Sequence, residues 1–217
     1  RYQEMIEEHI STEMNGVFKA VSEAGGDMQK VAPSGFPVLN MLNTRYFIFP
    51  LQGGKTVPIQ NPYTLGNAWY VDNANEEIDA LHRIDPAKTA VVDKKFSAEV
   101  KSAAETDTLG TIKLTAYEPN DLKYEVNSKT GGTVVFSEIY YPGWQAYIDG
   151  VEAPHGRADY ILRAMNVPAG KHVVEFKFDP KSLHVTETVA FVALGVLTCV
   201  LVLFLFLQVR RARRKIN

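Results

Sequence analysis

An uninterrupted apolar run near the C-terminus, Val189–Val209, constrains this chain more than any other feature. Its 21 residues carry no charge, and only Thr198 and Gln208 are clearly polar. At about 1.5 Å per helical residue the run spans roughly 31 Å, close to the hydrocarbon thickness of a bilayer. A buried core helix is the alternative, but such helices are usually shorter and carry a polar stripe. We therefore predict a transmembrane helix over 186–209.

The segment that follows, 210–217, predicts the orientation of this helix. It holds five cations and no acid: Arg210, Arg211, Arg213, Arg214 and Lys215. Basic flanks are retained on the cytoplasmic side, so we expect a basic cytoplasmic tail. A tail-anchored protein with a cytosolic body would instead carry these charges across the membrane, at about 2.5–3.5 kcal/mol each at the bilayer centre. We expect a membrane protein with residues 1 to about 185 outside the cytoplasm.

The first residues do not supply a way to export such a body. They read RYQEMIEEHI, which is charged and amphipathic and differs from the apolar core of a signal peptide. We therefore expect the chain to be the C-terminal piece of a longer membrane protein. The upstream transmembrane part of that protein is then one expected partner, and the lipid bilayer is another.

Composition excludes one class of partner. The chain holds 23 Lys+Arg and 25 Asp+Glu, and without the five basic residues of the tail 18 cations face 25 acids, a formal charge of −7. A net acidic body is a poor polyanion binder, so nucleic acid is excluded as a partner. The single cysteine, Cys199, lies in the predicted span and says nothing about the redox compartment.

Residues 1–97 predict a small α+β part. Apolar residues at helical spacing indicate a helix over 1–12, broken at Ser11–Gly16, and a second short helix over 17–24. Aromatic and β-branched runs indicate strands at 45–49, 68–71 and 89–92. Between the last two, Asn73–His82 resembles a helix with acids in its first turn. Strand, helix and strand together suggest an α+β or βαβ unit.

Residues 98–183 change to strands alone and predict an antiparallel, jelly-roll-like β-sandwich. Polar and apolar residues alternate over 112–116, 122–126 and 174–178, as expected for half-buried strands. Thr133–Tyr141 is apolar on both sides, so we place it in the centre of its sheet. Asp149-Gly150 between two short apolar runs predicts a type I′ hairpin. The fold class is therefore α+β, with an N-terminal α/β part, a β-sandwich and one C-terminal transmembrane helix.

Known catalytic motifs are absent from the sequence, which has no G-x-S-x-G, H-E-x-x-H, P-loop or G-x-G-x-x-G. The five histidines are scattered, and none is paired at the spacing of metal ligands. We therefore predict no catalytic residue, no metal site and no cofactor in this chain.

Aromatic residues supply the best candidate site. Tyr140, Tyr141, Trp144 and Tyr147 surround one predicted turn, and Trp69 lies earlier. Sugars stack on such rings while amides and carboxylates bind their hydroxyls. Core or inter-domain packing is the alternative for most of these rings, and anchoring at the membrane interface is another. The predicted glycan-binding residues are Asn67, Trp69, Tyr141, Trp144, Tyr147 and Asp149.

Several segments, in order, resemble the C-terminal part of the bacterial YfhO-type membrane proteins. They read LNMLNTRYF, GNAW, YYPGWQAYIDG, RAMNVPAGKH and FKFDP, at 39–47, 66–69, 140–150, 163–172 and 176–180. The resemblance covers most of the chain, and it implies that the membrane is the bacterial inner membrane. It also implies a many-span protein related to the GT-C glycosyltransferases, which use polyprenyl-phosphate sugars to decorate cell-envelope polymers or lipids. The acidic catalytic residue of such enzymes lies in an early extracytoplasmic loop, which would precede Arg1.

Two functions therefore remain open. In the first, the chain is the accessory domain and last span of a lipid-linked glycosyltransferase and shapes the acceptor site above the membrane. In the second, it is a membrane-anchored sandwich that recognises envelope glycan, or has a structural role, without transfer chemistry. Upstream sequence would separate them, since further spans with an acidic first loop favour transfer and a lone signal peptide favours the anchored binder.

Overall fold

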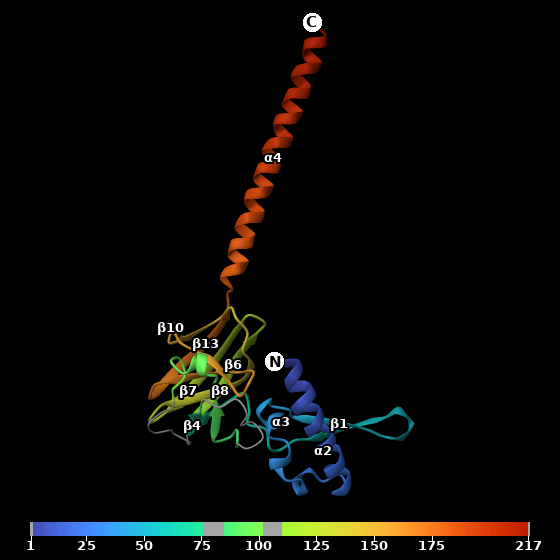
Figure 1. Cartoon of the computed structure of the whole chain (residues 1–217), viewed down its shortest axis with the longest axis vertical. Coiled ribbons are helices and arrows are strands. Elements are labelled where there is room, and N and C mark those ends of the chain that lie inside the picture. The colour runs from blue at the N-terminus through green and yellow to red at the C-terminus, as the bar shows by residue number, and fades with distance from the viewer. Residues whose placement is uncertain (1, 76–84, 102–109, 217) are drawn as a thin grey trace. The chain divides into compact units, whose positions relative to one another are not determined.

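The computed structural model describes residues 2–75, 85–101 and 110–216, and it divides into two compact units (Figure 1). The first unit is Arg1–Lys177 and the second is Phe178–Asn217. Within the first unit, a small helical part at the N-terminus precedes antiparallel sheets that form a β-sandwich-like body, and the second unit contains one long apolar helix. These features confirm the predicted fold class.

The N-terminal part opens with one continuous helical stretch rather than two helices. It comprises α1 (Tyr2–Glu4), the π-helical η1 (Met5–Ile10) and α2 (Ser11–Glu23). The break expected at Ser11–Gly16 is wrong, because the Ser11 hydroxyl donates to the Ile6 carbonyl at 2.8 Å and leaves the helix intact. The helix ends at Gly25 and Gly26, whose φ angles of 65° and 88° suit glycine.

Short elements complete this part. They are η2 (Met28–Lys30), η3 (Pro33–Gly35), α3 (Pro37–Met41) and the antiparallel hairpin of β1 (Tyr46–Pro50), η4 (Gln52–Gly54) and β2 (Thr56–Gln60). Glu13 of α2 joins the helices, because its carboxylate accepts the backbone N–H groups of Val38 and Leu39 at 3.1 and 2.9 Å. These donors at the start of α3 would otherwise lack partners.

Among the described residues, one face of the sandwich is a four-stranded sheet, which we call the inner sheet. Its strand order is β11 (Gly156–Ala158), β12 (Leu162–Val167), β8 (Gly132–Ile139) and β3 (Ala68–Val71). β8 lies between two neighbours, so the central position predicted for Thr133–Tyr141 is confirmed. β3 comes from the part of the sequence before residue 98 and pairs with β8, from Ala68↔Phe136 to Val71↔Thr133.

The other face, again among the described residues, is a five-stranded sheet, which we call the outer sheet. Its order is β10 (Val151–Ala153), β9 (Trp144–Ile148), β13 (Gly170–Phe178), β7 (Asp121–Ser128) and β6 (Thr111–Glu118). Asp149 and Gly150 join β9 to β10 with φ angles of 52° and 81°. A two-residue loop with both φ angles positive is a type I′ turn, as predicted.

Two hydrophobic cores lie on opposite faces of the inner sheet. Tyr70, Val134, Phe136 and Met165 point toward the outer sheet, where they meet Tyr124, Val174 and Phe176. Their neighbours Trp69, Val71, Val135 and Ala164 point the other way and pack with residues of the helical part, including Met5, Val38 and Met41. Because successive side chains of a strand alternate in direction, a strand with a core on each face is apolar at every position.

Two further elements lie beside the core on the helical side. They are a short parallel pair, β4 (Asn73–Asn75) with β5 (Thr89–Val91), and the turn η6 (Lys94–Phe96). Asn73–Asn75 was expected to begin a helix and is instead extended. The chain here pairs with Thr89–Val91, and this non-local pairing overrides the local helix signal. The rest of the predicted helix, at 76–82, lies outside the described residues, as does most of 99–108.

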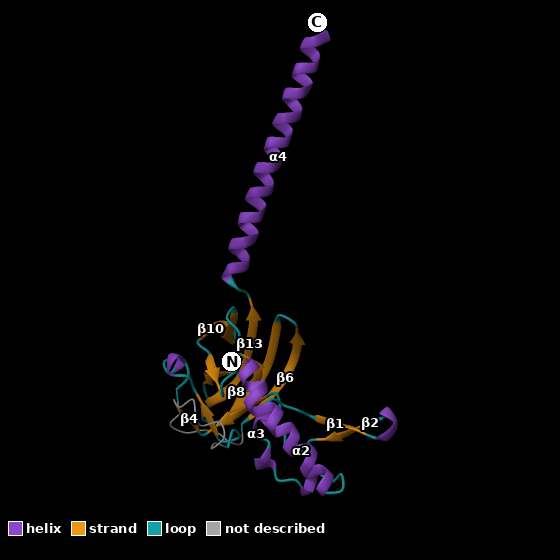
Figure 2. Cartoon of the chain, turned by 45° about the vertical axis from the view of Figure 1, so that its right-hand side comes forward, coloured by secondary structure: helices purple, strands orange, loops and turns teal. Residues whose placement is uncertain are grey.

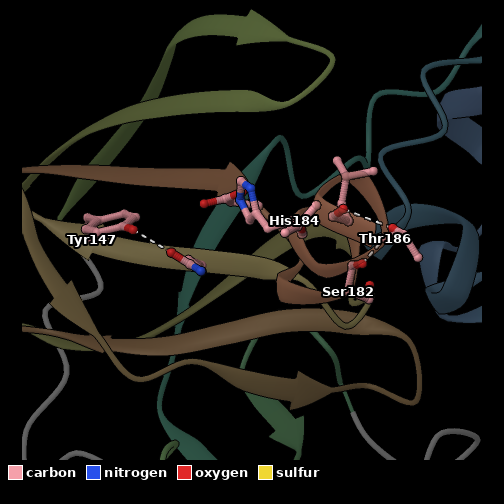
Figure 3. A network of polar contacts seen from close by, with 8 residues as sticks. Tyr147, Ser182, His184 and Thr186 are labelled. Atoms are coloured by element: carbon pink, nitrogen blue, oxygen red, sulfur yellow. Dashed lines mark hydrogen bonds and ion pairs between the residues drawn. The ribbon is translucent and has the colours of Figure 1, made fainter. Parts of the chain in front are cut away.

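The second unit is built on α4 (Lys181–Ile216). Among the described residues it contains the one helix long and apolar enough to cross a membrane, Lys181–Gln208, with a mean hydropathy of 3.0 and no part of the apolar window buried. Figure 2 shows it as a single uninterrupted helix. Thr186 donates to the Ser182 carbonyl at 2.8 Å (Figure 3), and Thr198 does the same to Leu194 at 2.8 Å. The polar hydroxyls are thus satisfied within the helix, as a membrane requires.

Candidate functional site

An open groove of about 510 Å³ lies on the outer sheet. Its lining comes from β6, β7, β13 and the β9–β10 turn: Thr111, Lys113, Glu125, Val126, Asn127, Asp149, Lys171, His172 and Val173. Most of these residues belong to the face of the sheet that points away from the sandwich core. Val126 and Val174, which alternate with them along β7 and β13, are buried in that core. We call this face, with the groove, the groove face.

Strand register places the lining residues in two rows across the sheet. Lys171 pairs with Asn127, which pairs with Thr111. Val173 pairs with Glu125, which pairs with Lys113. Directly opposed residues of antiparallel strands have Cβ atoms about 4.5–5.5 Å apart, so the side chains of each row are neighbours. The first row is polar throughout, and the second contains the apolar Val173. The groove therefore offers ammonium donors, carboxylate acceptors, an amide and a hydroxyl within a small area.

Asp149 extends the second row to a fourth strand. Its backbone N–H donates to the Val173 carbonyl at 2.9 Å, and its carboxylate accepts the Val173 N–H at 2.8 Å. The other carboxylate oxygen lies 2.6 Å from His172 Nδ1, while His172 Nε2 lies 3.0 Å from the Ala169 carbonyl oxygen. Both ring nitrogens therefore face acceptors, which favours the doubly protonated imidazolium.

Hydrogen bonding shifts both pKa values of this pair. The pKa of Asp149 is lowered, first by the Val173 N–H and then by the bond from His172. The pKa of His172 is raised, first by Asp149 and then by the Ala169 carbonyl. Both shifts favour the charged forms, so the end of the groove carries an ion pair rather than two neutral groups.

An aromatic ring continues the same face beyond the groove. Tyr147 lies two residues before Asp149 on β9 and donates its hydroxyl to Gln145 at 2.6 Å (Figure 3). Lys177 Nζ lies 5.4 Å from the centroid of the Tyr147 ring, and Glu175 binds both Lys177 and Lys123, at 3.1 and 2.8 Å. These bonds hold the polar groups beside the ring in place.

The structure does not bring the six residues predicted from the sequence together in one place. Tyr147 and Asp149 share the groove face. Tyr141 is 61% exposed and lies in the turn between β8 and β9, whereas Trp144 is half-buried, packs against the sandwich core and stacks on Arg163. Trp69 is buried in the core on the helical side, where its Nε1 donates to the Pro86 carbonyl at 2.8 Å. Asn67 accepts a bond from Asn43 at 2.9 Å.

Sequence reasoning missed most of the groove: Thr111, Lys113, Glu125, Asn127, Lys171 and His172. A signal was present, because several of these residues are the polar half of the alternation that predicted the strands. Alternation shows that polar residues share a face, but it does not show which strands are neighbours. The order β13-β7-β6 brings 171–173 beside residues more than 40 positions earlier in the chain.

A β-sandwich followed by a helix that can cross a bilayer defines a membrane protein with a β-rich module outside the lipid. Within the described residues, no cluster of three or more His, Cys, Asp or Glu side chains is arranged to hold a metal ion.

Residues 90–190 match the model of a protein family described as bacterial membrane protein YfhO. This match confirms the resemblance found in the sequence. The matched region runs from β5 to the first turns of α4 and includes the whole outer sheet. No curated protein matches the chain.

Proposed function

We propose that this chain is the extracytoplasmic accessory module and a membrane span of a lipid-linked glycosyltransferase, and that its groove face holds the envelope glycan or lipid that accepts the sugar. The groove on the outer sheet is the observation that carries this proposal. The match of residues 90–190 to the YfhO family model and the candidate span support the membrane setting. The transfer chemistry, which uses a polyprenyl-phosphate sugar, belongs to another part of the protein.

The groove has the chemistry that sugar hydroxyls need. Glu125 and Asp149 supply carboxylate acceptors, Lys113 and Lys171 supply donors, and Asn127 supplies both. Val173, which is 40% exposed, provides an apolar patch between them. Beside the groove, the Tyr147 ring offers a surface on which the C–H face of a sugar can stack. Polar groups that surround a small apolar area are typical of a site that orients a polar ligand.

Binding is tested by titrating the full chain in nanodiscs with a panel of envelope glycans. Tyr147→Ala is expected to weaken binding by about 1–2 kcal/mol, or about 5–30-fold, from the loss of ring stacking. Glu125→Gln is expected to weaken it as well, because the carboxylate acceptor is lost. Tyr2→Ala is the matched control, since Tyr2 is 48% exposed on the N-terminal helix. Equal affinity of all four proteins would remove the binding role.

Tyr141→Ala asks how far the ligand extends. Tyr141 lies outside the groove lining but is 61% exposed near the start of β9. A loss of affinity comparable to that of Tyr147→Ala would extend the ligand site to the β8–β9 turn. No loss would confine the site to the outer sheet.

Transfer is tested in the full-length protein. Membranes are supplied with a polyprenyl-phosphate sugar carrying a radiolabel, and incorporation of the label into envelope polymer is measured. The groove variants are expected to reduce incorporation at low acceptor concentration and to approach the normal rate at high acceptor concentration. Glycan binding by the chain with no incorporation by the full-length protein would instead favour a membrane-anchored binder without transfer chemistry.

Orientation has its own test. In a Cys199→Ala background, Lys19→Cys is expected to react with a membrane-impermeant maleimide in intact spheroplasts. Arg211→Cys, after the span, is expected to react only after lysis. The opposite pattern would place the β-sandwich in the cytoplasm and overturn the envelope-glycan proposal.

A further inference from the structure

The β1–β2 hairpin has one buried face and one exposed face. Pairing of Phe47 with Ile59 and of Phe49 with Val57 places these side chains on the face toward the helical part. There Phe47 is buried, and the Phe49 ring meets that of Phe18 edge to face at 4.7 Å. The alternate pairs, Tyr46↔Gln60, Ile48↔Pro58 and Pro50↔Thr56, form the other face, and all six of these residues are exposed.

The exposed face and tip of this hairpin are unusually apolar. Tyr46 is 57% exposed, Ile48 53% and Leu51 52%. Among the described residues before α4, ten large hydrophobic side chains are exposed, and three of them, Tyr46, Ile48 and Leu51, lie on this face or at the tip. A fourth, Val57, lies on the opposite face near the tip. In Figures 1 and 2 the hairpin extends beyond α2 and α3, with its tip away from the helices. Apolar groups gathered on a projecting element mark an interaction surface.

Charge indicates what this surface meets. The 44 residues between Asp27 and Asp72 include no acid, in a chain whose residues before the basic tail carry a formal charge of −7. Arg45 stands at the base of the hairpin and the exposed Lys55 at its tip. Isolated cations beside Tyr, Ile and Leu side chains complement an anionic lipid surface, where the cations meet headgroups and the apolar groups enter the boundary of the acyl chains.

We propose that the β1–β2 hairpin is a second membrane contact of this protein, and that its tip and exposed face, Tyr46–Gln60, dip into the headgroup region of an anionic bilayer. None of the residues that line the groove lies in the hairpin, so this role does not require the groove face. A hairpin held at the lipid surface in addition to α4 would restrict the tilt of the β-sandwich above the membrane.

The test places a fluorophore on the hairpin of the full chain. In a Cys199→Ala background, Thr56→Cys is labelled with an environment-sensitive dye and the protein is reconstituted into phosphatidylglycerol or phosphatidylcholine vesicles. In phosphatidylglycerol the label is expected to be at least threefold more quenched by brominated lipid, and at least threefold less quenched by aqueous iodide, than a label at Lys19→Cys on α2. In phosphatidylcholine the contrast is expected to shrink.

Variants identify the groups responsible. Ile48→Ser with Leu51→Ser is expected to abolish quenching by brominated lipid. Lys55→Gln is expected to lower the equilibrium constant for insertion of the hairpin about fivefold, and to do so only in phosphatidylglycerol vesicles. Tyr117→Ser, at an exposed aromatic residue of β6, is the control and should have no effect. Because all these side chains are exposed, circular dichroism and tryptophan fluorescence should match those of the unmodified protein.

Two outcomes would overturn the proposal. If iodide quenches the Thr56 label as strongly as the Lys19 label in both vesicles, the hairpin stays in water. If the Thr56 label is shielded from iodide and from brominated lipid alike, a protein surface covers the hairpin instead of lipid.

Discussion

The guanidinium carbon of Arg163 lies 4.0 Å from the centroid of the Trp144 ring. Arg163 is 2% exposed, its Nε donates to the Ile139 carbonyl at 3.0 Å, and the Phe176 ring lies 5.1 Å away. Two rings and a carbonyl thus surround a buried cation, and burial lowers its pKa from the ordinary value. The stacking assigns Trp144 a structural role beside the sandwich core.

Trp144→Ala is expected to lower the free energy of unfolding by about 3–5 kcal/mol, because it leaves a cavity and removes the partner of a buried cation. Trp144→Phe keeps a ring in place and should cost less. Urea denaturation of the chain in detergent, followed by far-ultraviolet circular dichroism, measures both. Tyr141→Ala is the control and should change stability by less than about 0.5 kcal/mol. Equal stability of Trp144→Ala and Tyr141→Ala would contradict the role given to Trp144.

Asp159 is expected to make stability fall as the pH rises. The side chain is fully buried, Oδ1 accepts the Val91 N–H at 2.8 Å, and burial raises the pKa to about 7. The folded state then holds a proton that the unfolded state releases near pH 3.8. Its contribution is therefore complete below about pH 4 and declines toward pH 7, with a slope of at most about 1.4 kcal/mol per pH unit.

Asp159→Asn tests this dependence, since the amide keeps an acceptor for Val91 and cannot ionise. The variant should show a flatter dependence of unfolding free energy on pH between 4 and 7, measured by urea denaturation at several pH values. Glu152→Gln, at an exposed carboxylate of β10, should leave the slope unchanged. A slope that persists in Asp159→Asn would assign the effect to another group.

The ion pair of Asp149 and His172 predicts a second pH dependence of stability, in which stability declines at both acidic and alkaline pH. The raised pKa of His172 means that its contribution is complete below about pH 6.5 and is lost as the pH rises through the folded-state value. The lowered pKa of Asp149 means that its contribution is complete above about pH 3.8 and is lost as the pH falls further. The β9–β10 hairpin should be most stable between about pH 3.8 and about pH 6.5.

His172→Gln should remove the alkaline limit of this window. Amide hydrogen exchange at Asp149 and Val173, measured across the pH range and corrected for intrinsic rates, reports the local opening of the β9–β10 turn. Lys171→Gln, at the neighbouring position, should retain the window. A pH profile of His172→Gln that equals that of the unmodified chain would show that the pair does not hold the turn.

Gly131 is expected to resist substitution. Its φ is +75°, and a Cβ atom there would lie 2.6 Å from the Val167 carbonyl oxygen and 2.8 Å from the Ala169 nitrogen. Gly131→Ala should therefore destabilise by about 2 kcal/mol or more, since it adds backbone strain to a collision with backbone. Gly16→Ala is the matched control, because that helical position has nothing within 4 Å of the added atom. It should stabilise by about 0.5–1 kcal/mol.

Local signals in the sequence predicted the features that depend on neighbouring residues. The apolar run gave the candidate span, Asp149-Gly150 gave the type I′ turn, and the two-sided apolar character of β8 gave its central position. Each of these depends on the chemistry of a short segment. Such segments retain their meaning wherever the rest of the chain folds.

Features that depend on distant pairing were not predictable in the same way. β3 joins β8 across more than 60 residues, so the sequence left Trp69 open between a sugar site and core packing, and the structure places it in a core. The groove combines β6, β7 and β13, and its charged residues become a site only when the strand order is known. Asn73–Asn75 has polar residues typical of a helix start, but the partner strand determines its conformation.

The placement of β8 between two cores has a consequence for the way the first unit melts. Val134 and Phe136 complete one core, and Val135, between them, completes the other. Unfolding of either core would expose the apolar side chains on one face of β8 to water. We therefore expect the two cores to unfold together. Calorimetry should record a single cooperative transition for residues before α4, with the helical segment and both sheets disappearing together.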